Sequence, residues 1–190
     1  MIISHEHKFV FIKTRKTSGS TIEKLLLPYL DKTRDTCTGS INENIIPFNH
    51  KGLRGHVSYS SILTAFPETK GYWFFTIERN PWDKVLSSYY WYNTTGPLLD
   101  FINSSECPND WNRYRGIFPK GHAFTYEKML DLYSALSDRY KVNINPELVR
   151  STKLKETNRP REYKKIYSEE EKDAITKLFN KEIRHFNYEY

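Results

Sequence analysis

The chain has 190 residues, a formal net charge of +6 and an aromatic content of 15%. That length can bury a hydrophobic core without disulfides or metal, so we expect a single domain over residues 1–190. The basic excess favours anionic partners such as nucleotides, acidic sugars or nucleic acid, although it also fits an ordinary solvated surface. Cys37 and Cys107 have no CxxC or metal-ligand spacing and are expected to be free thiols.

The sequence has no clear targeting or membrane signal. Its first residues, MIISHEHKFVFIK, carry charges too early for the apolar region of a secretory signal. No apolar run approaches the roughly 18 residues that a membrane span requires. We therefore expect a cytoplasmic protein without a membrane span.

The first third of the chain predicts a strand, two helices and a long loop. Residues 8–13 contain the apolar run FVFI and are predicted to form a buried strand. After a polar turn, apolar residues recur at helical spacing as far as Pro28, which should kink or end that helix. Residues 31–55 are rich in Asn, Thr, Gly and charge and predict a loop. Residues 58–66 predict a short helix capped by Ser58.

The clearest strand prediction lies in the middle of the chain. Residues 72–77, YWFFTI, are aromatic, β-branched and uncharged. Asn80 and Pro81 then supply an N-cap and a first helical residue for the next helix. Residues 98–102 predict one or two further helical turns, and residues 103–121 predict a loop.

The C-terminal part predicts one strand and two helices. Residues 123–125 predict a short strand and residues 126–140 a helix, whereas residues 150–165 are basic and irregular. Ser168 and Glu171 fit a capping box that opens a last helix, which should extend to about residue 183. Its predicted buried face consists of Ile175, Leu178, Phe179 and Ile183. Alternating strands and helices predict an α/β fold of three layers, with a central parallel sheet flanked by helices.

A cation, a glycine and several hydroxyls follow the first predicted strand. They belong to Lys16, Thr17, Ser18, Gly19, Ser20 and Thr21. A helix N-terminus offers unpaired N–H groups and partial positive charge to an anion, and small residues allow that anion to approach closely. The segment therefore predicts a phosphate site, with an ordinary polar turn as the alternative. It lacks the glycine spacing of the GxxxxGK[ST] loop of triphosphate-binding enzymes.

A second candidate phosphate site follows the strongest predicted strand. Arg79 lies at the carboxyl end of that strand, where ligands collect in open α/β sheets. Its guanidinium suits a phosphate dianion. Ser87 lies about 10 Å along the next helix at 1.5 Å per residue, within reach of a long arginine. The alternative is that Arg79 pairs with a nearby acid, Glu78 or Asp83.

Together, the two segments resemble the sulfotransferases that use 3′-phosphoadenosine 5′-phosphosulfate (PAPS). The carbohydrate-type and bacterial branches of that family carry a KTxGTS-like loop after the first strand and an RNPxxRxxSxY motif. This chain has KTSGST at residues 16–21 and RNPWDKVLSSY at residues 79–89, with Lys84 in place of the second arginine. The segments HVSY from His56 and YEKML from Tyr126 also resemble the family, as do the later EYKKIY and FNY.

The resemblance implies a P-loop-like nucleotide-binding fold and PAPS as the co-substrate, with no metal. Lys16 would contact the bridging and sulfuryl oxygens, and the backbone of residues 17–21 would surround the 5′-phosphate. Arg79 and Ser87 would hold the 3′-phosphate. The acceptor would be a hydroxyl group, with a glycan favoured.

Three residues are candidates for the base that takes the acceptor proton. His56 is the first, because imidazole titrates near neutral pH and the family has a histidine at that place. His50 lies in the same loop and is the second, and Glu23 is the third. The basic residues within 153–165 are a candidate segment for covering the nucleotide, with a solvated surface as the alternative.

Two other functions remain open from the sequence. One is a P-loop kinase of a small hydroxylated substrate, which would share the strand, loop, helix and lysine. The other is a non-catalytic nucleic-acid-binding domain, because a basic chain rich in aromatic residues can stack bases over a charged groove.

Overall fold

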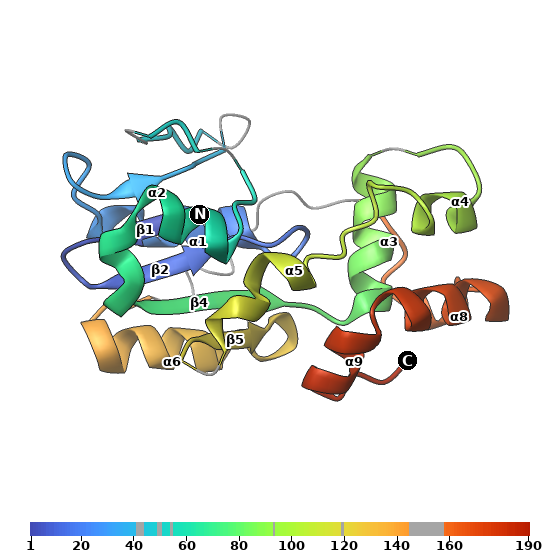
Figure 1. Ribbon diagram of the computed structural model, residues 1–190. Coiled ribbons are helices and arrows are strands. Elements are labelled where there is room, and N and C mark those ends of the chain that lie inside the picture. Colours follow the sequence, from blue (N-terminus) through green and yellow to red (C-terminus); the bar gives the residue numbers. More distant parts are fainter. Residues whose placement is uncertain (41–43, 49–50, 54, 93, 119, 145–157) are drawn as a thin grey trace.

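A five-stranded sheet forms the centre of the molecule (Figure 1). The computed structural model describes residues 1–190 apart from 41–43, 49–50, 54, 93, 119 and 145–157. Within the described residues the strand order is β3-β1-β2-β4-β5. The strands are β1 (Ile2–Ser4), β2 (Phe9–Ile12), β3 (Thr36–Cys37), β4 (Trp73–Glu78) and β5 (His122–Thr125).

The predicted α/β fold is confirmed, and its sheet is mixed rather than parallel throughout. Strands β2, β4 and β5 are parallel to one another, whereas β1 pairs antiparallel with both β2 and β3. The three parallel strands lie where strands were predicted. Strands β1 and β3 were not predicted, because three and two residues are too few to show a hydrophobic period.

Helices connect the strands and cover both faces of the sheet. The α-helices are α1 (Gly19–Leu26), α2 (Tyr59–Ala65), α3 (Pro81–Trp91), α4 (Leu98–Ile102), α5 (Trp111–Tyr114), α6 (Met129–Tyr140), α8 (Glu169–Leu178) and α9 (Asn180–Phe186). Single turns of 3₁₀ helix are η1 (Leu27–Tyr29), η3 (Pro67–Gly71), η4 (Arg115–Ile117), η5 (Tyr126–Lys128) and η6 (Tyr163–Lys165). In the described part of the chain, no helix has both the length and the apolarity to cross a bilayer.

The predicted helix starts are confirmed by their capping bonds. Ser58 caps α2 through its side chain, and Asn80 caps α3 with Pro81 at the first helical position. Ser168 opens α8 in a reciprocal capping box with Glu171. These polar groups satisfy first-turn amides that have no carbonyl partner inside a helix.

Two predictions about the second half of the chain are wrong. The predicted loop over residues 103–121 contains α5 and η4, which are too short to show a helical period. The predicted last helix is divided between α8 and α9, because Phe179 leaves helical geometry with φ of −105°. Ile175 and Phe179 are fully buried, but Leu178, predicted to be buried, is 40% exposed.

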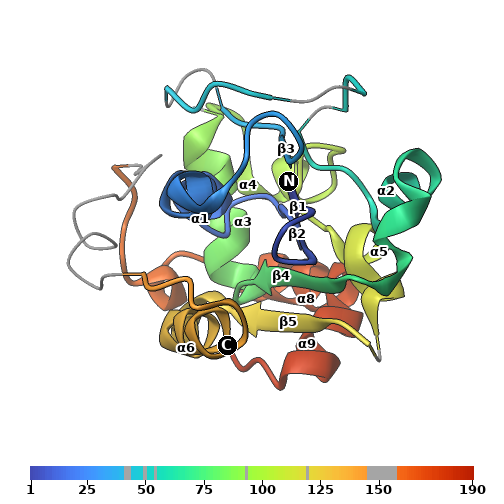
Figure 2. The same cartoon turned by 90° about the vertical axis from the view of Figure 1, so that its left-hand side faces the viewer.

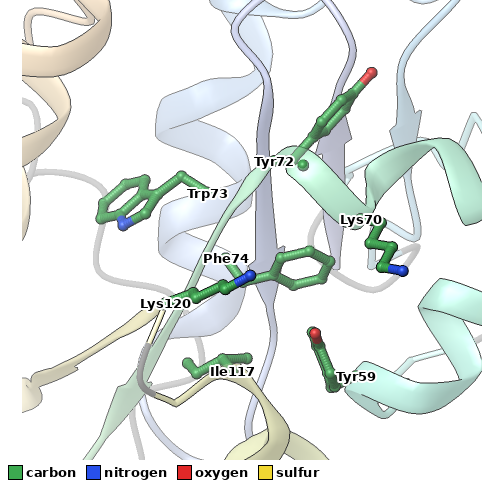
Figure 3. Close-up of a pocket in the computed structure, with 9 residues that line it drawn as sticks. Tyr59, Lys70, Tyr72, Trp73, Phe74, Ile117 and Lys120 are labelled. Atoms are coloured by element: carbon green, nitrogen blue, oxygen red, sulfur yellow. The ribbon is translucent and has the colours of Figure 1, made fainter.

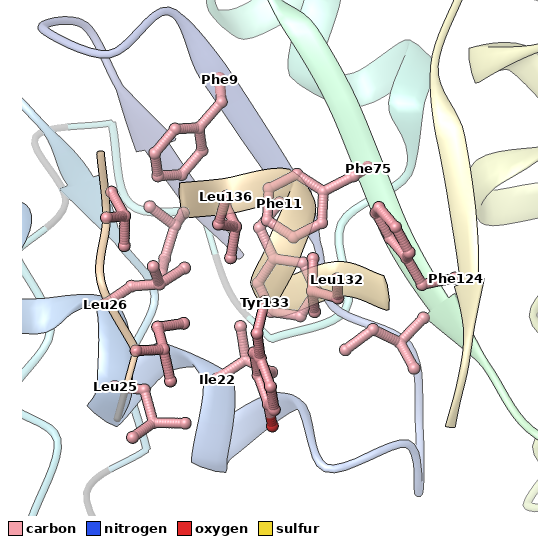
Figure 4. Close-up of a cluster of buried hydrophobic side chains, with 14 of the residues drawn as sticks. Phe9, Phe11, Ile22, Leu25, Leu26, Phe75, Phe124, Leu132, Tyr133 and Leu136 are labelled. Carbon is pink, nitrogen blue, oxygen red and sulfur yellow. The ribbon is translucent and has the colours of Figure 1, made fainter. Parts of the chain in front are cut away.

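Alternate residues of each central strand enter different cores, giving the predicted three layers (Figure 2). Phe11 and Phe75 pack with α1 and α6 on one face (Figure 4). Val10 and Phe74 pack with α2 and α5 on the other. A third cluster joins α3, α4 and α8 beyond the carboxyl end of β4 (Figure 1). The sheet thus holds both strand ends and the following turns in fixed positions.

The core at Phe75 should contribute strongly to stability. Phe75 is fully buried between two strands and α6, so Phe75→Ala should lower the free energy of unfolding by about 3–5 kcal/mol through lost burial and a cavity. Leu130 is 67% exposed on α6, and Leu130→Ala should change it by about 0.5 kcal/mol or less. Urea denaturation followed by circular dichroism measures both. Equal losses for the two variants would contradict this assignment of the core.

Candidate functional site

The two candidate phosphate segments follow adjacent parallel strands. Strands β2 and β4 pair with Ile12 opposite Thr76, so both strands point their carboxyl ends to the same edge of the sheet. The loop of residues 13–18 leaves β2 there and leads into α1, and Arg79 leaves β4 there and leads into α3. The parallel pairing therefore brings together two segments that lie about sixty residues apart in sequence, at the edge where α/β proteins bind ligands.

The loop after β2 has an unusual backbone that favours anion binding. Lys16 and Ser18 have left-handed conformations with φ of 57° and 62°. Such φ values are uncommon for residues other than glycine, and they cost energy that surrounding structure must offset. Ser18 is the N-cap residue of α1, but its side chain makes no capping bond. The Ser18 side chain therefore does not close the N-terminus of α1, the end of a helix that favours anions.

Hydroxyl groups inside the loop hold its shape. The Thr14 hydroxyl donates to the carbonyl of Ile77 in β4. The Thr17 hydroxyl is buried, lies 2.9 Å from that of Thr14 and donates to the Thr14 carbonyl at 3.2 Å. Both hydroxyls thus bind the loop to itself and to β4. Thr17 is fully buried, and its side chain helps to hold the shape of the loop.

A glycine at position 19 is required by the lysine beneath it. A Cβ atom on Gly19 would lie 2.6 Å from Cγ of Lys13. Lys13 cannot easily move, because its Nζ forms an ion pair of 2.5 Å with the buried Glu23. Glu23 also binds the Met1 ammonium at 2.7 Å. Burial raises the pKa of Glu23, but the two ammonium groups outweigh it and hold the pKa below its ordinary value. This engagement in two ion pairs argues against Glu23 as the base.

Arg79 connects the two segments directly. Its Nη1 donates to the carbonyl of Lys16 at 3.1 Å. Its Nε donates to Asp83 at 2.7 Å, and its Nη2 pairs with the same carboxylate. The guanidinium also lies 4.2 Å from the ring centroid of Tyr126. The pairing with Asp83, which the sequence left open as an alternative, therefore exists together with the contact to the loop.

The basic segment near the C-terminus reaches the same carboxylate. Nη2 of Arg159 lies 2.6 Å from Asp83, and both side chains are largely buried. Two guanidinium groups thus meet at one carboxylate beside the loop. Lys153 and Lys155, in the same predicted basic segment, lie outside the described residues, as does the candidate base His50.

Lys16 extends toward the helix that carries Ser87. Its Nζ lies 4.4 Å from the ring centroid of Trp91, a cation–π contact. Trp91 follows Ser87 by four residues in α3, so the two share a helix face. Ser87 is buried, whereas Trp91 is 38% exposed. Sequence reasoning did not single out Trp91, although its spacing from Ser87 was a usable signal.

Two further segments meet beside Arg79, at Asn80. The Asn80 amide donates to the Glu127 carboxylate at 2.8 Å, and the Asn80 side chain donates to the carbonyl of Glu189 at 3.0 Å. The Tyr188 hydroxyl donates to Glu127 at 3.4 Å. The segments at 126–130 and 186–188, quoted for the resemblance, therefore lie around the start of α3.

A network of buried charged side chains next to the candidate site was not predicted from the sequence. Lys84 is fully buried and its Nζ contacts Glu78 at 2.7 Å and Asp110 at 3.5 Å. Burial lowers the pKa of Lys84, but these carboxylates outweigh it and raise the pKa. Asp110 also accepts from the Arg15 amide at 2.7 Å and from Arg15 Nε at 3.0 Å. Lys84 stands where the RNPxxRxxSxY motif has its second arginine. Its ion pairs link the end of β4 to Asp110, which precedes α5 and binds Arg15 in the loop.

His56 lies at the edge of the loop in the state that a base requires. Its Nδ1 is 2.9 Å from the carbonyl oxygen of Lys13. A carbonyl only accepts, so Nδ1 carries the proton and Nε2 keeps its lone pair in the neutral ring. Burial lowers the pKa of His56 to about 4. The ring is therefore neutral at physiological pH.

This state of His56 can be measured by NMR. Between about pH 6 and 8 the ring should stay neutral with Nδ1 protonated, because its pKa is about 4 in the folded protein. Long-range ¹H–¹⁵N spectra of the imidazole should report that tautomer, and the signals should shift only as the pH falls toward 4. The signals of His56 can be assigned from their loss in His56→Gln. Titration near pH 6.5, or a proton on Nε2, would contradict the described hydrogen bond.

Comparison with known proteins identifies the fold. No family model and no curated protein matches the sequence. Among solved structures, the chain is similar to the mouse sulfotransferase SULT7A1 complexed with PAP, with a TM-score of 0.58 and 13% identity. The match covers 96% of this chain and 86% of the mouse chain. The chain therefore has the α/β fold of a sulfotransferase.

Proposed function

We propose that this protein transfers a sulfuryl group from PAPS to a hydroxyl acceptor. The observation that carries the proposal is the 3.1 Å hydrogen bond from Arg79 to the Lys16 carbonyl, which makes the two candidate phosphate segments neighbours. A nucleotide phosphorylated at two separate places needs two such adjoining sites. The fold likeness to a sulfotransferase complexed with PAP adds support.

The loop after β2 is the proposed site for the 5′-phosphosulfate. The first-turn amides of α1 and the loop backbone would surround the phosphate, where the partial positive charge of the helix favours an anion. The proposed contacts come from Lys16, Thr17, Ser18, Gly19, Ser20 and Thr21. Gly19 leaves room for the Lys13 side chain that packs against this end of the helix.

Arg79 and Ser87 are the proposed site for the 3′-phosphate. A guanidinium has five N–H donors, and the contacts described above engage three of them, with Asp83 and the Lys16 carbonyl. The remaining two leave Arg79 able to bind a phosphate while it still joins the two motifs. Arg159, on the same carboxylate, would add a second cation beside that phosphate.

The proposed reaction is an in-line displacement at sulfur. The acceptor oxygen forms a bond to sulfur as the bond between sulfur and the bridging oxygen breaks, and adenosine 3′,5′-bisphosphate leaves. Nε2 of His56 takes the acceptor proton. The Lys16 ammonium, after leaving Trp91, would stabilise the charge that develops on the bridging oxygen. The rate enhancement then comes mainly from positioning and electrostatics.

The proposed acceptor is a carbohydrate, and the proposed branch is the carbohydrate-type or bacterial one. The KTSGST loop and the net charge of +6 support these parts of the proposal. A cytoplasmic location is supported by two buried cysteines that are free thiols, as expected in a reducing compartment.

Ligand-dependent thermal stability tests the proposed donor. PAPS and adenosine 3′,5′-bisphosphate should raise the melting temperature, because each can engage both motifs and binds the folded state. AMP, without a 3′-phosphate, should raise it much less. Arg79→Ala should remove most of the difference between the bisphosphate and AMP. The AMP effect should fall less than the bisphosphate effect, because, among the described contacts, Arg79 touches the loop only through the Lys16 carbonyl. Stabilisation by Mg-ATP but not by the bisphosphate would instead favour the kinase reading.

Lys16 should be needed for turnover more than for folding. Lys16→Ala should lower the rate of sulfuryl transfer by roughly 100-fold or more, because a donor aimed at developing charge is lost. Unliganded thermal stability should change little, since the side chain is partly exposed. The rate is measured as bisphosphate release from PAPS with an active acceptor, and Lys24→Ala, on the exposed face of α1, is the control. Near-normal turnover in Lys16→Ala would remove its proposed role.

A further inference from the structure

A separate pocket lies at the opposite end of the sheet from the proposed donor site (Figure 3). Its volume is about 340 Å³, and it is lined where β4 and β5 begin. Phe74, in its wall, precedes Arg79 by five residues, which is about 17 Å along a strand at 3.3 Å per residue. That volume lies within the usual range for small-molecule sites. The pocket is therefore too far from Arg79 to be part of the same site.

The inner wall of this pocket is apolar and aromatic. Phe74 and Ile117 are 4% and 2% exposed and form its buried side. Tyr59 packs edge-on against Phe74, with ring centroids 4.9 Å apart and planes at 77°. In Figure 3 the Phe74 ring has the Lys120 side chain on one side and the Lys70 and Tyr59 side chains on the other. A flat apolar group can therefore pack against the rings of Phe74 and Tyr59.

The outer part of the pocket carries positive charge. Lys70 and Lys120 line it, and none of the described lining residues carries a carboxylate. In the described part of the chain, neither lysine forms an ion pair with an acidic side chain. The Tyr59 ring adds a hydroxyl to the same space (Figure 3). Two ammonium groups over an apolar wall are complementary to a molecule that has one anionic group and one flat ring system.

We propose that this pocket binds a small aromatic anion, namely a ring system bearing a carboxylate, sulfate or sulfonate group. The ring packs against Phe74 and Tyr59, and the anionic group lies between Lys70 and Lys120. The site is independent of the proposed donor site and does not depend on the sulfotransferase assignment.

Gly71 provides a way to block the pocket without disturbing its walls. It lines the pocket, and a Cβ atom added there meets no heavy atom within 4 Å. Its backbone is not in the left-handed region, so Gly71→Val adds a side chain at the wall of the pocket without that strain. A second variant, Lys70→Ala/Lys120→Ala, removes the charges. The matched control, Lys24→Ala/Lys177→Ala, removes the same net charge from exposed helix positions away from the pocket.

The test is a fluorescence titration of the full chain with 8-anilinonaphthalene-1-sulfonate, an aromatic sulfonate. One saturable site is expected, with affinity reduced about tenfold or more in Gly71→Val and in the Lys70/Lys120 variant, and unchanged in the control. Circular dichroism and melting temperatures establish that each variant is folded. Saturating adenosine 3′,5′-bisphosphate should leave the titration unchanged.

Three results would overturn the proposal. They are equal affinity in all variants, loss of affinity in Gly71→Val but not in the Lys70/Lys120 variant, and displacement of the sulfonate by the bisphosphate. The titration with the pocket variants uses no PAPS or acceptor, so its outcome is separate from that of the donor experiment.

Discussion

One guanidinium joins the two halves of the candidate site. Arg79 follows β4, yet it donates to the backbone of the loop that follows β2, at the carbonyl of Lys16. Asp83 holds the same guanidinium from within α3, and Tyr126 covers its face. The parallel pairing of β2 with β4 is the constraint that makes this contact possible, because it sets both strand ends at one edge of the sheet.

Buried charges fix the elements on which this contact depends. Lys84 joins Glu78 at the end of β4 to Asp110, and Asp110 binds the backbone and side chain of Arg15 in the loop. Breaking such a pair by removing one partner strongly destabilises a protein, because a charge is left buried and unpaired. The network also explains why the loop can keep two residues other than glycine in left-handed conformations. Rigid support of this kind is what positioning of a nucleotide requires.

Local signals in the sequence predicted much of this site, and long-range contacts did not. The apolar run of β4 and the helix cap at Asn80 each depend on residues close together in sequence, so the strand β4 and the helix α3 could be predicted. The contact of Arg15 with Asp110 joins residues 95 positions apart, and the hydrophobic periodicity of a short segment cannot predict such a contact. Leu178 was predicted to be buried because its spacing from Ile175 fits a helix face, but that spacing does not show how far the buried face extends around α8. The convergence of Arg79 on Lys16 needed the strand order, which the sequence pattern alone does not fix.

A crystal structure of the complex with adenosine 3′,5′-bisphosphate tests the central claim most directly. The account predicts one nucleotide with its 5′-phosphate at the N-terminus of α1 and its 3′-phosphate at Arg79 and Ser87, and with the Arg79 contact to the Lys16 carbonyl retained. A nucleotide that touches only one of the two segments, or that binds away from the carboxyl ends of β2 and β4, would contradict it.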